Sequence, residues 1–140
     1  QVYDAFYSDE LAKGLFHGHT YTANPLACTA ALAGIWLLQS KEIQNSIKRV
    51  IRSHKAFGNK IESHPKVAAI RQCGVIFALD VNVQMERYGS LRDKLFNHFM
   101  ANGVFLRPLG NTIYILAPFV ITDAEMTKIY ETIESALELI

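Results

Sequence analysis

The pattern of apolar and polar positions divides the chain into a helical first part and a mixed second part. Nearly every position from 25 to 39 is apolar or small, which predicts a helix buried on all sides. From 41 to about 62 the apolar positions recur every three or four residues, as expected for a helix with one buried face. Those positions are Ile43, Ile47, Val50, Ile51, Phe57 and Ile61. His64 and Pro65 then end the helical pattern.

After Pro65 the apolar period shortens to that of strands. Residues 67–71 and 75–81 are predicted strands, with Gly74 at a bend or bulge between them. Cys73, beside that glycine, is predicted to be a small buried residue. The change of period shows that helices and strands share this second part of the chain.

The last fifty residues alternate between helix and strand signals. Ser90 and Asp93 resemble a capping pair that opens a helix to about Met100, and Asn102-Gly103 would end it. Two short strands are predicted at 104–106 and 112–116.

The turn between those two strands is predicted at 108–111, which contains Pro108 and Gly110. A final helix follows, because Thr122 and Glu125 have the spacing of a capping box before a periodic apolar run. Together these elements predict an α+β unit with helices packed on one face of a small sheet.

Composition narrows the class of protein. The 140 residues are half hydrophobic, enough for one ordinary domain with a sizeable core. The net charge of +1 gives no basic field for nucleic acid or an anionic membrane. No apolar run reaches the ~18–20 residues that span a bilayer, and no signal peptide is recognisable. Cys28 and Cys73 have no Cys-x-x-Cys spacing, which favours a reducing cytoplasm. Because the chain begins at Gln1, we expect the natural protein to begin earlier.

A polar loop lies directly before the first long helix. Asn24 can cap that helix, and Pro25 suits its first position. Gly18 allows close backbone approach, and Thr20 offers a hydroxyl beside the exposed amides of the helix start. These features suit an anion, most naturally a phosphate, although a plain structural turn has the same composition.

Arg107 is the second candidate functional residue. It ends a predicted strand in an apolar setting, and a buried guanidinium without a partner is costly. It either pairs with an acidic side chain, is simply exposed at the strand end, or binds a substrate carboxylate in a two-pronged geometry. The five histidines are scattered and have no metal-site spacing, so no metal centre is expected.

Two segments resemble the class III pyridoxal-phosphate aminotransferases: HGHTYTANPLAC at 17–28 and GVFLRP at 103–108. The resemblance implies a fold-type I transferase, in which 1–40 ends the large domain and 41–140 forms the small C-terminal domain. YDAFY at 3–7 is most similar to the branch that transfers the amino group of S-adenosylmethionine to 8-amino-7-oxononanoate. That reaction gives 7,8-diaminononanoate in biotin synthesis. The cofactor implied is pyridoxal 5'-phosphate.

The same resemblance implies roles for individual residues. Thr20 would hydrogen-bond the cofactor phosphate across the interface of a homodimer, and His19 would be a neighbouring cofactor contact. Other members can have proline at the position of His19, so only its backbone role carries over readily. Gly18 would line the substrate pocket, and Arg107 would bind the substrate carboxylate. Tyr114 would approach the same pocket, although a core tyrosine with a satisfied hydroxyl is equally consistent with its strand.

The lysine that forms the Schiff base in this family lies before the loop at 17–28. None of the lysines in this chain has a matching context, so we expect the chain to be inactive alone. Two alternatives remain open at this stage. One is another class III transaminase that uses an ω-amino acid or ornithine, and the other is a binding module without catalysis.

Overall fold

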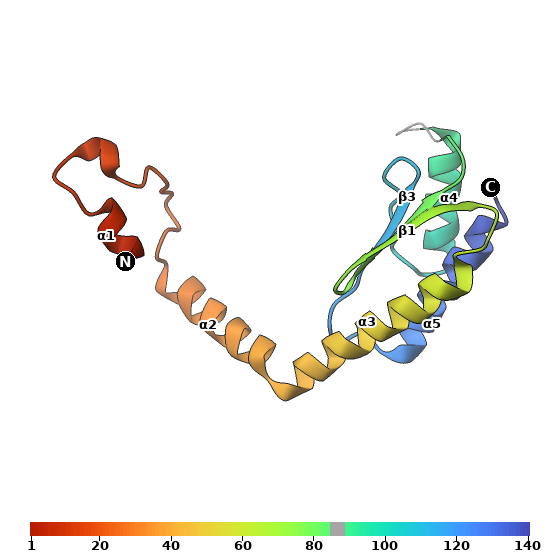
Figure 1. Cartoon of the computed structure of the whole chain (residues 1–140), viewed down its shortest axis with the longest axis horizontal. Helices are drawn as coiled ribbons and strands as arrows, with labels where there is room; N and C mark the ends of the chain where they lie inside the picture. The colour runs from red at the N-terminus through yellow and green to blue at the C-terminus, as the bar shows by residue number, and fades with distance from the viewer. Residues whose placement is uncertain (85–88) are drawn as a thin grey trace. The chain divides into compact units, whose positions relative to one another are not determined.

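A computed structural model describes residues 1–84 and 89–140 of the chain (Figure 1). The chain divides into two compact units, Gln1–Leu37 and Leu38–Ile140. The assignment of residues 1–40 to a large domain remains a prediction.

The first unit contains a short helix α1 (Val2–Phe6), a single 3₁₀ turn η1 (Leu11–Lys13) and most of helix α2 (Pro25–Gln39). The bounds predicted for α2 are therefore confirmed. The prediction that this helix is buried is wrong for this chain, since none of its residues is buried and Trp36 is 69% exposed. Its apolar side chains have no covering element within the described residues.

Helix α3 (Lys41–Ile61) begins the second unit and confirms the predicted one-sided pattern. The Ser40 hydroxyl caps it by accepting a hydrogen bond from the amide of Ile43, at 3.3 Å. Val50, His54, Phe57 and Ile61 form its buried face, and each is at most 4% exposed.

Strands β1 (Val67–Cys73), β2 (Ile76–Val81) and β3 (Thr112–Leu116) form an antiparallel sheet in the order β1-β2-β3. Gly74 has a φ of 57° in the tight turn between β1 and β2, a conformation that suits glycine. The irregularity in register lies elsewhere, between Val67 and Ala69.

Cys73 is exposed, so its predicted burial is wrong. It pairs in register with Ile76, which in turn pairs with Leu116. Because side chains alternate along strands, these residues point away from the buried Phe77. Cys73 therefore lies on the outer face of the sheet, opposite the core.

Residues 104–106 are not a strand, contrary to the prediction. The amide of Leu106 donates locally to the carbonyl of Val104, at 3.1 Å, and Pro108 has no amide hydrogen to donate. The alternation that suggested a strand is nevertheless present, because Val104, Leu106 and Pro108 are buried while Phe105 and Arg107 are exposed.

The predicted turn after this segment does form. The backbones of Leu109 and Thr112 exchange hydrogen bonds of 2.9 and 3.1 Å, and Gly110 has a φ of 59°. Strand β3 begins directly after this turn, so only the first of the two predicted strands is missing.

Two further helices complete the unit, α4 (Ser90–Ala101) and α5 (Asp123–Leu137). Gly103, with a φ of 69°, follows α4 as predicted. The predicted capping pair of α4 is wrong, because Gly89 is the N-cap and Ser90 is already helical. The capping box of α5 is confirmed, since Thr122 and Glu125 exchange both of its hydrogen bonds.

The core lies between one face of the sheet and helices α3, α4 and α5, which confirms the α+β prediction (Figure 1). Its buried side chains come from all of these elements and include Phe57, Ile61, Phe77, Leu79, Ile113, Ile115, Leu95, Phe99, Ile133 and Leu137. Within residues 1–84 and 89–140, no helix is both long and apolar enough to cross a membrane.

Candidate functional site

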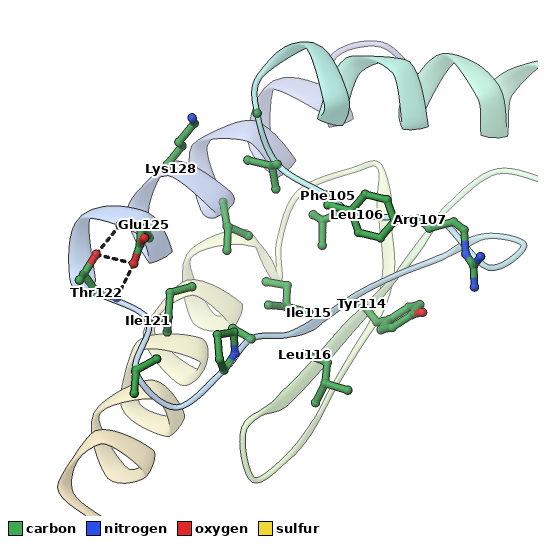
Figure 2. A pocket seen from close by; sticks show the side chains of 16 residues that line it. Phe105, Leu106, Arg107, Tyr114, Ile115, Leu116, Ile121, Thr122, Glu125 and Lys128 are labelled. Carbon is green, nitrogen blue, oxygen red and sulfur yellow. Dashed lines mark hydrogen bonds between the residues drawn. The ribbon is translucent and has the colours of Figure 1, made fainter. Parts of the chain in front are cut away.

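A groove of about 900 Å³ opens in the second unit. One wall is the extended segment 103–107, and the other is formed by the end of β3 and the segment that leads into α5 (Figure 2). Ile129 of α5 also lines it. The groove thus brings together three stretches of the chain between Gly103 and Ile129.

Arg107 and Tyr114 both line this groove, and Figure 2 shows them at the same end of it. Arg107 is exposed and forms no ion pair with any carboxylate of residues 1–84 and 89–140. Tyr114 is 36% exposed on the outer face of the sheet, so it is not a core tyrosine. This end of the groove therefore offers a cation and a phenol.

The middle of the groove is apolar, and its other charged groups lie on α5. Glu125 accepts hydrogen bonds from the amide and the hydroxyl of Thr122, at 2.8 and 2.7 Å. The amide hydrogen bond, followed by the hydroxyl, lowers the pKa of the Glu125 carboxyl, which therefore stays ionised. Its negative charge is used for capping. The groove suits a ligand with an anionic end and an apolar body.

Arg49 fixes the segment that leads into α5. Its guanidinium donates to the carboxylate of Asp123 and to the backbone carbonyl of Ile121, which lines the groove. Its partners lie 72 and 74 residues away, so no local pattern could indicate the contact.

In the first unit, the loop before α2 has the predicted cap. The Asn24 side-chain oxygen accepts hydrogen bonds from the amides of Leu26 and Ala27, at 3.0 and 3.2 Å. The amide of His19 donates to the Thr22 hydroxyl at 3.0 Å. The backbone amide of His19 therefore already has a partner inside the loop.

Gly18 and Thr20 remain accessible in this loop. A side chain added at Gly18 would meet no atom within 4 Å, and Thr20 is exposed. Among the described residues, the Thr20 hydroxyl has no hydrogen-bond partner, so it fits a role as donor to a phosphate. The His19 amide does not fit that role in this conformation.

The statistical model of the family described as aminotransferase class-III matches residues 1–137. The chain belongs to the class-III aminotransferase family. Over 98% of its length it is 36% identical to the adenosylmethionine-8-amino-7-oxononanoate aminotransferase of Synechococcus elongatus, of which it covers 32%.

Solved structures agree on the fold. The crystal structure of the adenosylmethionine-8-amino-7-oxononanoate aminotransferase from Methanocaldococcus jannaschii has a TM-score of 0.82 and 24% identity, over 99% of this chain and 33% of that one. An omega transaminase from Pseudomonas jessenii, solved in complex with PMP, has a TM-score of 0.75 and 20% identity, over 91% of this chain and 29% of that one. The chain thus spans about a third of the length of the relatives it matches.

Proposed function

We propose that this chain is the C-terminal portion of an aminotransferase that moves the amino group of S-adenosylmethionine to 8-amino-7-oxononanoate. The product is 7,8-diaminononanoate, for biotin synthesis. The observation that carries this proposal is the 36% identity to the Synechococcus elongatus relative over nearly the whole chain. Residues 1–40 end the large domain of the longer protein, and 41–140 form its small C-terminal domain.

In this proposal Arg107 binds the carboxylate of the acceptor. Its exposure, and its lack of an ion pair among the described residues, support that role. A charged, two-pronged hydrogen bond of this kind contributes roughly 1.5–3 kcal/mol. Tyr114 lines the same end of the groove. The resemblance to the family supports a separate assignment of Gly18 to the lining of the substrate pocket.

The proposed cofactor is pyridoxal 5'-phosphate. Family membership supports it, as does the PMP bound to the Pseudomonas jessenii neighbour, because PMP is the amino form of the same cofactor. When bound, the cofactor supplies the chemistry of amino-group transfer by acting as an electron sink. The Thr20 hydroxyl donates to its phosphate, and His19 is a neighbouring contact. The covalent attachment of the cofactor is not assigned to any lysine of this chain.

The longer protein acts as a cytoplasmic homodimer in this proposal, and Thr20 reaches the phosphate site of the partner subunit. The exposed apolar surface of α2 supports a covered position for this helix in the complete enzyme, since Leu26 and Trp36 are 82% and 69% exposed here. Cross-linking and sedimentation of the full-length protein measure the dimer directly.

The test of the proposed function is an assay of the full-length protein, loaded with pyridoxal 5'-phosphate. We expect 7,8-diaminononanoate to form from S-adenosylmethionine and 8-amino-7-oxononanoate. Transfer to ω-amino-acid or ornithine-derived acceptors, with none to 8-amino-7-oxononanoate, would make the substrate assignment wrong. Absence of transfer to every acceptor would favour the binding module instead.

A further inference from the structure

Phe105 is the most exposed aromatic side chain of the groove, at 74%. It lies two residues before Arg107 on an extended segment, so both side chains point away from the buried Val104 and Leu106. Figure 2 shows the ring between the rest of the groove and Arg107. The ring therefore borders the place where a carboxylate bound to Arg107 would continue into its carbon chain.

Phe105 is part of a larger apolar surface. Leu116 and Val120, on the opposite wall of the groove, are 64% and 72% exposed. Large apolar side chains that gather on one concave surface mark a binding site more often than scattered ones do. The cation at the end of this surface determines which kind of ligand fits, namely one with an anionic head and an apolar chain.

The ring of Phe105 also has a defined orientation. Phe96 of α4 contacts it edge to face, with ring centroids 6.2 Å apart and planes at 82°. The guanidinium of Arg92 lies over the ring of Phe96, 5.5 Å from its centroid. These contacts hold Phe105 at the groove although most of its surface is exposed.

We propose that Phe105 is a specificity-determining residue, whose ring forms the wall for the methylene chain of the acid that Arg107 binds. This inference rests on the proposed function and refines its acceptor site. Phe96 is a positioning residue, since it acts through the ring of Phe105. The groove thereby favours long-chain acids over short ones that carry the same carboxylate.

The test uses the full-length holoenzyme and a series of oxo-acid acceptors with increasing numbers of methylene groups. Each methylene that loses its apolar contact weakens binding about 4-fold. We therefore expect Phe105→Ala to raise KM for 8-amino-7-oxononanoate roughly 10- to 50-fold and KM for the shortest acceptor less than 3-fold. Phe105→Leu keeps an apolar wall and should recover most of the lost discrimination. Phe96→Ala should cause a smaller loss with the same dependence on chain length.

Leu109→Ala is the matched control. Leu109 follows the extended segment, at the start of the turn before β3, and is 59% exposed, but it does not line the groove. Its replacement should leave the dependence on chain length unchanged. An equal change in KM for all acceptors in Phe105→Ala, or no change, would overturn the inference while the proposed function stands. A wild-type enzyme that does not use 8-amino-7-oxononanoate would overturn the proposed function itself.

Discussion

The Nδ1 atom of His54 lies 2.9 Å from the hydroxyl oxygen of Tyr130, inside the core of the second unit. The other ring nitrogen of His54, Nε2, is 3.1 Å from the backbone carbonyl of Val75. A carbonyl can only accept, so Nε2 carries the hydrogen and Nδ1 accepts from the tyrosine. A neutral imidazole therefore joins α3 to α5 and to the turn between β1 and β2.

This arrangement makes the stability of the chain sensitive to acid. Burial lowers the pKa of His54 from its ordinary value of 6.5, against the smaller raising effect of the hydrogen bond to Val75. Below pH 6.5 the unfolded chain takes up a proton at this histidine before the folded chain does. The free energy of unfolding should thus fall with decreasing pH, by at most about 1.4 kcal/mol per pH unit. Urea unfolding between pH 5 and 8 measures this slope.

The control for this prediction is His54→Phe, which keeps a ring against Phe77 but cannot titrate. It should flatten the slope below pH 6.5. It should also lower stability at neutral pH, by about 1–3 kcal/mol for each buried polar group left without a partner. An unchanged slope in this variant would assign the acid sensitivity to other groups.

Tyr130→Phe tests the same contact from α5. Burial raises the pKa of Tyr130, so its hydroxyl stays protonated as a donor. Loss of that donor leaves Nδ1 of His54 without a partner while the stacking on Phe57, at 4.2 Å between centroids, is kept. We expect stability to fall by about 1 kcal/mol. Tyr114→Phe, at a partly exposed position, should have little effect on unfolding.

Removal of the capping box of α5 should lower the free energy of unfolding. Thr122→Ala removes the hydroxyl that accepts from the amide of Glu125 at 3.3 Å. Loss of such a cap costs about 1 kcal/mol, which chemical denaturation can resolve. Thr127→Ala is the control, because Thr127 is exposed in the interior of the same helix. Equal losses in both variants would contradict a specific role for the cap.

Arg107→Ala should impair binding of the acceptor more than the rate of catalysis. Loss of a charged hydrogen bond of roughly 1.5–3 kcal/mol corresponds to a rise in KM of roughly 10- to 150-fold. Arg107→Lys should recover only part of the lost affinity, because its ammonium group keeps the positive charge but lacks the two-pronged geometry. Arg52→Ala, at an exposed position of α3, serves as control. An unaltered KM in Arg107→Ala would show that another group binds the carboxylate.

Thr20→Ala should weaken retention of the cofactor in the full-length enzyme, roughly 10-fold for one charged hydrogen bond. The visible spectrum after dialysis measures the cofactor that remains. Thr20→Ser keeps the hydroxyl and should retain more cofactor. Thr29→Ala is a suitable control, because the Thr29 hydroxyl donates to the carbonyl of Pro25 within α2. A spectrum unchanged by Thr20→Ala would contradict the proposed contact.

Features that depend on neighbouring residues could be predicted from the sequence. The cap at Asn24 and the box formed by Thr122 and Glu125 each lie within one helical turn, and all are present. The exposed surface of α2 could not be predicted, because burial depends on a covering partner that these residues do not include.

The candidate site was predictable in part. The sequence indicated Arg107 and Tyr114 as separate candidates. Only the fold shows that both line one groove. Phe105 was missed, although its alternation with Val104 and Leu106 placed it on the side of Arg107. Segment 104–106 has the side-chain pattern of a strand without its backbone pairing, and hydropathy alone does not distinguish the two.

The wall that carries Phe105 and Arg107 is anchored by the inward side chains of Val104, Leu106 and Pro108. No ladder of backbone hydrogen bonds runs along this wall. Substitution of Phe105 or Arg107 therefore disrupts no strand pairing. During evolution these outward positions can diverge while the inward ones preserve the scaffold. Substitutions at these outward positions can thereby reshape the groove without rebuilding the sheet.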